Sequence, residues 1–286
     1  MTVAETLAKA EQFLASKRVS EAGANAEFIL AHVLGCRRPE LRVRGERPLT
    51  PQEERHAWHL LHERGGRQPL AYVLGTQEFM GLELEVNPSV LIPRPETEEL
   101  VQAVVLLASR IPRGASALQV LDIGTGSGCV SVALAHLLPE AQIVATDISA
   151  GALALAEKNA RRHQLGRRIR FLQADLFSAA GGARRAWADI AVSNPPYIPS
   201  AEVARLEPEV LREPRLALDG GKDGLEAIRA IVAEAPVDLK AGGFLALEIG
   251  HDQGPAVRRL LEKAGFKDIE LRKDAQGIER IVLARR

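Results

Sequence analysis

One short segment contains residue types that could hold a planar nitrogen group. In "AVSNPPYIPS", which covers residues 191–200, an apolar run ends at two prolines that cannot donate the hydrogen bonds of a strand. An amide or aminopurine nitrogen is a poor nucleophile because its lone pair is delocalised, so an enzyme that alkylates it must hold the NH₂ group by both hydrogens. We expect the Asn194 side-chain oxygen and the Pro195 carbonyl to accept those hydrogen bonds. Pro196 would stiffen the backbone, and the Tyr197 ring would lie on the planar group.

A glycine-rich turn earlier in the chain is typical of a nucleotide site. The stretch "LDIGTGSGCVSVALA" places Gly124, Gly126 and Gly128 between a predicted strand and a predicted helix, where glycines let a ligand approach the backbone. A GxGxG turn alone also occurs as a purely structural turn. However, Asp147 ends the next strand, where a carboxylate can accept both hydroxyls of an adenosine ribose, and Asp175 ends the third, beside the adenine. Together these residues favour a nucleotide-like cofactor.

Two residues of the turn indicate which cofactor this is. A dinucleotide fingerprint would have glycine or alanine at position 129, where this chain has Cys129. Asp122 places a carboxylate near the ligand, which suits a cationic amino-acid group better than a pyrophosphate. S-adenosylmethionine, which carries an ammonium and a sulfonium, therefore fits better than NAD.

The elements that must position these residues alternate along most of the chain. The pattern predicts helices at 127–138, 150–163, 223–235 and 254–264, and strands at 118–123, 142–146, 169–173, 188–193, 243–249, 267–272 and 278–284. Strands divided by helices predict an α/β fold with a doubly wound, mostly parallel seven-stranded sheet, and the last two strands predict an antiparallel hairpin. Asn194 would then lie at the carboxyl end of the fourth strand, beside the cofactor strand.

The first third of the chain has a different pattern. Residues 1–68 predict a small helical domain, with a capping box at "TPQEE", where Thr50 and Glu53 can satisfy each other's backbone N–H groups. From Pro69, β-rich runs separated by glycines predict a β-hairpin linker over 69–95. The α/β domain then spans 96–286.

Composition limits the function classes. The chain of 286 residues has 37 basic and 37 acidic residues, and a formal net charge of zero argues against a partner held by a phosphate backbone. We therefore expect no direct nucleic-acid partner. No export signal or membrane span is readable, and two isolated cysteines fit a reducing cytoplasm. His56, His59 and His62 recur at intervals of three, which is more typical of a solvated helix face than of a metal site, so no metal is expected.

The chain resembles the release factor glutamine methyltransferases, the PrmC/HemK family of S-adenosylmethionine-dependent enzymes. The resemblance covers nearly the whole sequence and rests on "PLAYVLG", "EFMGLELEVNPSVLIPRPETEEL", "LDIGTGSG", "TDIS", "NPPYI", "EPRLALDGGKDGL" and "LALEIG". It implies methylation of the side-chain amide nitrogen of the glutamine in the GGQ motif of peptide chain release factors. It also implies that residues 1–68 dock the release factor and that 96–286 form the methyltransferase domain.

The resemblance also assigns site residues. It implies that the Asn194–Tyr197 segment binds the glutamine and that Asn194 also lies at the cofactor. The cofactor residues that it implies are Asp122, Gly124, Thr125, Gly126, Ser127, Gly128, Asp147, Ile148, Asp175 and Leu176. Several relatives have tryptophan at the position of Leu176, so we expect only apolar packing there. Arg94 and Glu98 in "RPETE" are expected to contact the substrate, although the same segment is also a good helix start.

Two other functions share part of this pattern. DNA adenine methyltransferases also have NPPY, but zero net charge and the lack of an evident target-recognition region argue against DNA. A module that binds the nucleotide without chemistry would not need the NPPY segment, and a Pro-Pro turn ending an edge strand is the purely structural interpretation of it.

Overall fold

The chain divides into two compact units. The structure, a computed structural model, describes residues 1–111, 116–176, 186–274 and 276–286. One unit, here the helical unit, contains Met1–Thr76 and Glu207–Arg212. The other, here the sheet unit, contains Gln77–Leu206 and Glu213–Arg286.

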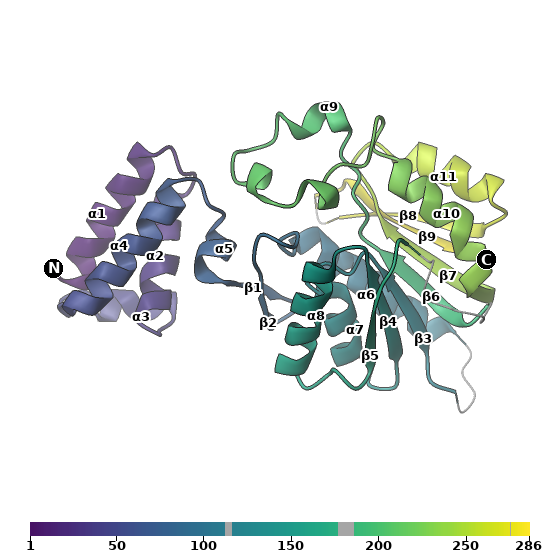
Figure 1. Cartoon of the computed structure of the whole chain (residues 1–286), viewed down its shortest axis with the longest axis horizontal. Coiled ribbons are helices and arrows are strands. Elements are labelled where there is room, and N and C mark those ends of the chain that lie inside the picture. Colours follow the sequence, from purple (N-terminus) through teal and green to yellow (C-terminus); the bar gives the residue numbers. More distant parts are fainter. Residues whose placement is uncertain (112–115, 177–185, 275) are drawn as a thin grey trace. The chain divides into compact units, whose positions relative to one another are not determined.

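The helical unit packs short amphipathic helices around its own core. Its helices are α1 (Val3–Ser16), α2 (Ala22–Val33), α3 (Arg38–Val43), α4 (Pro51–Gly65) and α5 (Leu70–Leu74). Helices α1, α2 and α4 contact one another, as Figure 1 shows, and bury Leu14, Ile29 and Leu61 between them. The predicted capping box of α4 is confirmed: Thr50 Oγ1 accepts from Glu53 N at 3.2 Å, and Glu53 Oε2 accepts from Thr50 N at 2.8 Å.

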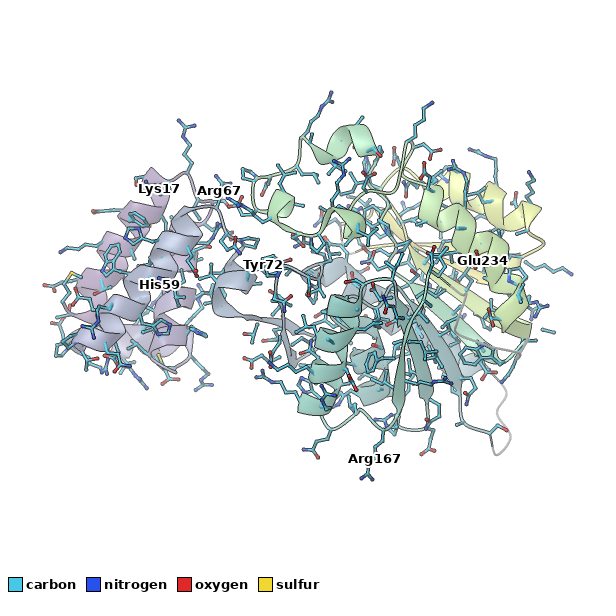
Figure 2. All side chains as sticks on the ribbon, in the orientation of Figure 1. Lys17, His59, Arg67, Tyr72, Arg167 and Glu234 are labelled. Atoms are coloured by element: carbon cyan, nitrogen blue, oxygen red, sulfur yellow. The ribbon has the colours of Figure 1, made fainter. Side chains whose placement is uncertain are left out.

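One segment of the helical unit comes from much later in the sequence. Residues Glu207–Arg212, which include the 3₁₀ turn η1 (Val210–Arg212), are anchored there by Glu209. The Glu209 carboxylate pairs with Arg64 Nη1 at 2.9 Å and with Arg67 Nη2 at 2.5 Å, and Arg67 is labelled in Figure 2. Since the Arg64 side chain is almost fully buried, this ion pair compensates a charge that would otherwise lack a countercharge.

The hairpin prediction over 69–95 is confirmed at 76–85, is wrong at 70–74, which is helical, and extends too far, because 86–94 contains no strand. The two-stranded sheet consists of β1 (Thr76–Phe79) and β2 (Leu82–Glu85), whereas Leu70–Leu74 is the short helix α5. Pro69 precedes α5, Gly75 ends it at φ +76°, and Ala71 and Val73 are buried. The β-branched and aromatic residues misled the prediction because tertiary burial outweighs such weak propensities over five residues.

The predicted doubly wound sheet is confirmed in the sheet unit. Its strand order is β5-β4-β3-β6-β7-β9-β8. The strands are β3 (Gln119–Ile123), β4 (Gln142–Asp147), β5 (Ile169–Gln173), β6 (Ala188–Ser193), β7 (Leu239–Glu248), β8 (Lys267–Lys273) and β9 (Glu279–Arg285). Pairs from β5 to β7 are parallel, while β9 is antiparallel to both β7 and β8. The chain reverses its winding direction between β3 and β6, which is where such sheets bind ligands.

Helices cover both faces of this sheet (Figure 1). The helices of the sheet unit are α6 (Pro95–Arg110), α7 (Cys129–Leu137), α8 (Ala150–Arg162), α9 (Ser200–Val203), α10 (Glu226–Asp238) and α11 (Gly254–Lys263), and η2 (Arg215–Ala217) is a 3₁₀ turn. Along β3, Val120 packs with α6 and α7, whereas Leu121 and Ile123 pack with α10. Burial on both faces explains why these strands are continuous apolar runs rather than alternating ones.

The histidine stripe of α4 lies on the surface of the helical unit. His56, His59 and His62 are exposed on α4, where Figure 2 labels His59, so the solvated-face interpretation of this stripe is confirmed. Across the part of the chain that the structure describes, no group of His, Cys, Asp and Glu is arranged to hold a metal ion. No helix in these residues has the length and apolarity of a membrane span.

Candidate active site

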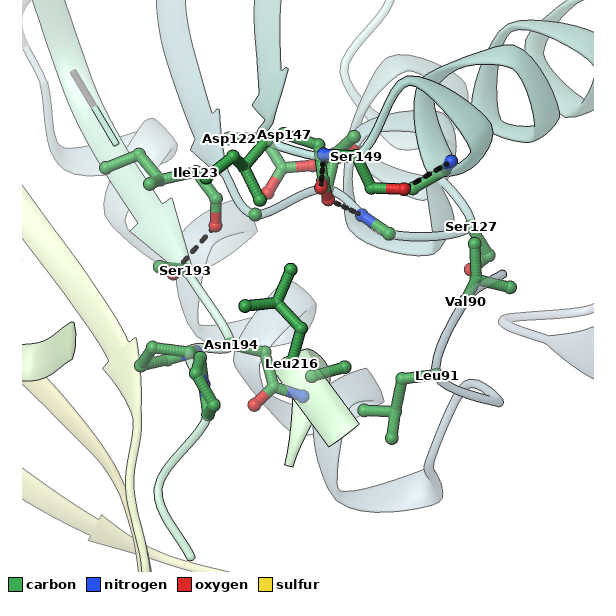
Figure 3. A pocket seen from close by; sticks show the side chains of 18 of the residues that line it. Val90, Leu91, Asp122, Ile123, Ser127, Asp147, Ser149, Ser193, Asn194 and Leu216 are labelled. Carbon is green, nitrogen blue, oxygen red and sulfur yellow. Dashed lines mark hydrogen bonds between the residues drawn. The ribbon is translucent and has the colours of Figure 1, made fainter. Parts of the chain in front are cut away.

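The carboxyl ends of β3, β4 and β6 open into a cavity of about 280 Å³. The cofactor residues expected from sequence that line it are Asp122, Gly124, Thr125, Gly126, Ser127, Asp147, Ile148, Asp175, Leu176 and Asn194. The expected substrate residues that line it are Arg94, Asn194, Pro195 and Pro196. Gly128, Tyr197 and Glu98 are not among its described lining residues. In Figure 3, Asp122 and Asp147 lie on one side of the cavity, and Asn194 and Leu216 face them.

The glycine turn between β3 and α7 requires its glycines for two reasons. Gly124, Gly126 and Gly128 have φ values of +72°, +55° and +81°, a region that other residues rarely adopt. A Cβ at Gly124 or Gly126 would meet no protein atom within 4 Å, so this backbone is open to a ligand. At Gly128 a Cβ would lie 3.0 Å from Ala156 Cβ, so this glycine allows α8 to pack closely instead. Gly128 therefore shapes the turn from outside the cavity.

Asp147 connects the end of β4 to the glycine turn. Its Oδ2 accepts a hydrogen bond from Gly126 N at 2.9 Å, and its Oδ1 accepts one from Ser149 N at 2.9 Å. Each carboxylate oxygen has a second acceptor site, so the group can still receive two hydroxyls. The position fits the ribose expected from the sequence.

Asp122 is a buried carboxyl at the end of β3. It is 1% exposed, and its Oδ2 accepts from Thr125 Oγ1 at 2.6 Å. Burial raises the pKa of Asp122 to about 7, although hydrogen bonds from Thr125 and Ser131 oppose this. A cationic ligand group nearby would favour its ionised form.

Ser127 provides an independent indication that the cavity takes a polar ligand. Its hydroxyl is buried and has no hydrogen-bond partner among the described residues, although the residue lines the cavity. An unsatisfied buried hydroxyl costs free energy unless a ligand or water bonds to it. Together with the open glycine backbone and two carboxylates, it gives a donor and acceptor set that fits S-adenosylmethionine.

Asn194 follows β6 directly and faces the cavity. The Ser193 hydroxyl, which donates to Ile123 O at 2.7 Å, ties the end of β6 to the end of β3 (Figure 3). Asn194 Nδ2 donates to Thr97 Oγ1 at 2.9 Å, and no hydrogen bond within the described residues reaches Asn194 Oδ1. The acceptor oxygen therefore stays available, as the proposed clamp for an NH₂ group needs.

Tyr197 lies behind the clamp rather than in the cavity. Its hydroxyl donates to Glu248 Oε1 at 3.3 Å, while Glu248 Oε2 accepts from Thr97 Oγ1 at 2.7 Å. Burial, followed by the charge of Glu248, raises the pKa of Tyr197, so its phenol stays protonated. The hydroxyl is held in the protein, and the side chain packs against the apolar cluster that contains Leu121 and Ile123.

A glycine loop braces the NPPY backbone. Gly220 lies so close that a Cβ would be 2.7 Å from Pro196 O, and a Cβ at Gly224 would overlap with Tyr197 O. Gln253 Nε2 donates to both Tyr197 O at 2.9 Å and Gly224 O at 3.1 Å. The glycines of "DGGKDGL" therefore have a physical role, because a side chain at Gly220 or Gly224 would collide with the backbone of the NPPY segment.

Arg94 and Glu98 are engaged with the protein in different ways. Arg94 lines the cavity and pairs with the buried Glu213 at 2.5 Å, and Glu213 Oε2 also accepts from Ile92 N at 3.0 Å. Glu98 Oε1 accepts from Met80 N at 2.7 Å, in the turn between β1 and β2.

Four residues of the site were not expected from the sequence: Thr97, Glu213, Glu248 and Gln253. A signal was present for Glu248, because an acidic residue inside the apolar run "LALEIG" must be paired where it is buried. Thr97 lies inside "RPETE", at the start of a helix, where threonine is an ordinary first-turn residue and predicts no further role. Glu213 and Gln253 contact residues that are far away in the sequence, so no local pattern predicts these contacts.

Comparisons with known proteins identify relatives over nearly the whole chain. A model of the PrmC N-terminal domain matches residues 5–75, and a model of the methyltransferase small domain matches residues 97–219. The release factor glutamine methyltransferase of Geobacter sulfurreducens is 45% identical over 98% of this chain and 95% of its own length. That of Moorella thermoacetica is 42% identical over 100% of this chain and 99% of its own. The solved N-terminal domain of human METTL16 in complex with SAH aligns with a TM-score of 0.54 at 16% identity, over 78% of this chain and 82% of that chain, and shows the same fold.

Proposed function

The chain belongs to the release factor glutamine methyltransferases, and from this premise we propose how its own residues perform the reaction. The enzyme transfers a methyl group from S-adenosylmethionine to the side-chain amide nitrogen of a glutamine in peptide chain release factors. The observation that carries the residue assignment is the unpaired Oδ1 of Asn194, within the described residues, at the edge of the cavity formed by the glycine turn.

The NPPY segment holds the acceptor nitrogen in this proposal. Asn194 Oδ1 and the Pro195 carbonyl accept the two N–H bonds of the glutamine amide, so the nitrogen lone pair is directed along the line of attack. Pro196 stiffens this backbone, and the ring of Tyr197 lies against the planar amide. No general base is needed, since an alkylated amide nitrogen is acidic enough to lose its proton to water. Positioning and preorganised electrostatics therefore supply most of the catalysis.

The cofactor residues divide by the part of the ligand that each would hold. S-adenosylmethionine supplies a methyl group on a positively charged sulfur. Asp147 would accept the ribose hydroxyls, and Asp122 together with Ser127 would bind the polar amino-acid end. The backbone of Gly124–Gly128, which includes Thr125, would contact the ligand, and Gly128 shapes the turn. Asp175, Ile148 and Leu176, which also line the cavity, would hold the adenine.

The proposal also gives each domain of the chain a role. Residues 1–68 dock the release factor, 69–95 connect, and 96–286 carry the chemistry on the glutamine of the GGQ motif. Arg94, which lines the cavity, borders the substrate, whereas Glu98 supports the turn between β1 and β2 through Met80 N. The protein works in the cytoplasm on a protein substrate, without direct nucleic-acid or membrane binding, in keeping with its zero net charge. Hydrogen exchange tests the docking role: release factor should slow exchange within 1–68, and protection confined to 96–286 would contradict it.

One labelling experiment tests the reaction. The protein is incubated with methyl-labelled S-adenosylmethionine and a bacterial release factor, the same factor with alanine in place of the GGQ glutamine, or duplex DNA. We expect label only on the unaltered release factor. Label on DNA would replace this function with nucleic-acid methylation, and cofactor binding without label on any of the three would indicate a binding module.

A further inference from the structure

We propose that Thr97 and Glu248 are positioning residues that orient the Asn194 amide, with its oxygen toward the substrate and its nitrogen toward the protein. This inference rests on the proposed function of Asn194 as the clamp for the glutamine NH₂ group. It concerns two side chains on elements far from β6 in the sequence, one in the first turn of α6 and one at the end of β7.

The contacts form a continuous chain. Asn194 Nδ2 donates to Thr97 Oγ1 at 2.9 Å, and Thr97 Oγ1 donates to Glu248 Oε2 at 2.7 Å. Thr97 and Glu248 are each 1% exposed, so the bond between them is buried, while the bond from Asn194 to Thr97 is partly buried at the edge of the cavity. Thr97 also lines the cavity, whereas Glu248 is not among the described lining residues.

The direction of each bond follows from the carboxylate. An ionised Glu248 only accepts, so the single hydroxyl hydrogen of Thr97 is committed to it. The Thr97 oxygen can then only accept from its other neighbour, which selects the NH₂ side of the Asn194 amide. Asn194 Oδ1 is thereby directed away from Thr97 and left for the substrate. A flipped amide would instead present two donors to a substrate NH₂ group, which also donates.

Glu248 fixes the other end of the NPPY segment as well. Its Oε1 accepts from the Tyr197 hydroxyl at 3.3 Å, so one carboxylate holds the last residue of the NPPY segment directly and the first residue through Thr97. Two neighbouring charges shift the pKa of Glu248: Glu96 on α6 raises it, and Arg280 on β9 lowers it. Burial is the largest influence and raises the pKa of Glu248 to about 7, against the hydrogen bonds from Thr97 and Tyr197.

Protonation of Glu248 would reverse the orientation of the Asn194 amide. A proton on Oε2 would be donated to Thr97, and the Thr97 hydroxyl would then donate to Asn194 Oδ1, which turns the amide NH₂ toward the cavity. The orientation that clamps the substrate therefore belongs to the ionised form. Methyl transfer should rise as pH increases through about 7, the pKa to which burial raises this group.

Three variants test the proposal. Thr97→Val keeps the shape but removes the hydroxyl, Thr97→Ser restores it, and Glu248→Gln replaces the pure acceptor by a group that also donates. We expect kcat for release factor methylation to fall roughly 10- to 100-fold in Thr97→Val and Glu248→Gln, with little change in the Kd of S-adenosylmethionine. Thr97→Ser should recover most of the rate. Glu248→Gln should also lose the rise of kcat near pH 7.

Glu96→Gln is the matched control. It removes a neighbouring acidic charge and makes none of the three hydrogen bonds, so kcat at pH 8 should stay near the unmutated value. Because the charge of Glu96 raises the pKa of Glu248, the midpoint of the pH profile should move to lower pH.

A second readout does not depend on turnover. In NMR spectra of ¹⁵N-labelled protein, the side-chain NH₂ of Asn194 should be protected from exchange, and this protection should be lost in Thr97→Val and below pH 6 in the unmutated protein. Unchanged protection in Thr97→Val, or equal loss of rate in Thr97→Val and Thr97→Ser, would overturn the positioning role. Failure of the unmutated enzyme to methylate a release factor would instead count against the proposed function, because the NMR result would stand without it.

Discussion

Asp147 Oδ2 accepts a 2.9 Å hydrogen bond from Gly126 N, so the end of β4 and the glycine turn after β3 are fixed to each other. Ser149 N donates to the other carboxylate oxygen, Oδ1, at 2.9 Å. The carboxylate is thus held by two backbone groups in one orientation, and its remaining acceptor sites face a position set by the fold. Preorganisation of this kind lowers the cost of binding, because the turn does not have to be ordered by the ligand.

Asp147→Ala should weaken S-adenosylmethionine binding by about 10- to 100-fold, the effect of losing hydrogen bonds to a charged acceptor. The variant removes both the acceptor for the ligand and the partner of Gly126 N. Calorimetric titration measures the Kd, and Glu157→Gln on the exposed side of α8 serves as the control. An unchanged Kd in Asp147→Ala would remove this residue from the cofactor site.

Asn194→Ala should keep S-adenosylmethionine binding and lose roughly 10²- to 10³-fold in kcat, the scale for removing one preorganised hydrogen-bond partner of the transition state. The side chain belongs to the proposed clamp, while the ribose and amino-acid contacts lie elsewhere in the cavity. Parallel measurements of kcat and of the cofactor Kd separate the two effects. Full turnover in this variant would exclude Asn194 from the reaction.

Gly224→Ala should destabilise the sheet unit and slow turnover, because the added Cβ overlaps with Tyr197 O at a residue with φ +75°. Gly265→Ala is the matched control, since Gly265 has φ +85° but no protein atom within 4 Å of the built Cβ. We expect the control to lose only about 1 to 2 kcal/mol, the cost of a left-handed residue, and Gly224→Ala to lose roughly 1 to 3 kcal/mol more from overpacking. Urea unfolding measures both, and equal losses would argue against the bracing contact.

Stability should fall as pH rises from about 4.5 to 7. Burial raises the pKa of Glu248 from 4.5 to about 7, so in this window the folded chain keeps a proton that the unfolded chain releases. A shift of this size corresponds to roughly 3 kcal/mol. Asp122 contributes in the same direction, because burial raises its pKa from 3.8 to about 7.

Denaturant unfolding at pH 5 and pH 7.5 checks this dependence. Glu248→Gln should reduce the pH slope without abolishing it, since Asp122 remains in that variant. A slope identical to that of the unmutated protein would mean that the carboxyl of Glu248 titrates normally in the folded state.

Most of the sheet unit could be predicted because its signals are local. Alternation of apolar runs with helical spacing predicted seven strands that the structure confirms, and the breaks at Gly124–Gly128 and at Pro195 located the turns that end β3 and β6. The short helix α5 was mistaken for β structure, because five residues carry too little periodicity to outweigh the β preference of Tyr72 and Val73. Glu207–Arg212 belongs to the helical unit, where Glu209 pairs with Arg64 and Arg67, and no local pattern encodes this pairing.

The sequence by itself determined which residues could take part: the acidic residues that follow strands, the glycines of the turn and the NPPY segment. Tertiary structure alone decided which way the Asn194 amide points. Its partner Thr97 lies 97 positions away, and the carboxylate that directs Thr97 lies 151 positions further along the chain from Thr97. A side-chain amide has no intrinsic preference between its two orientations. The preference arises only when the fold brings the Thr97 hydroxyl, whose hydrogen is donated to the buried Glu248, against the amide.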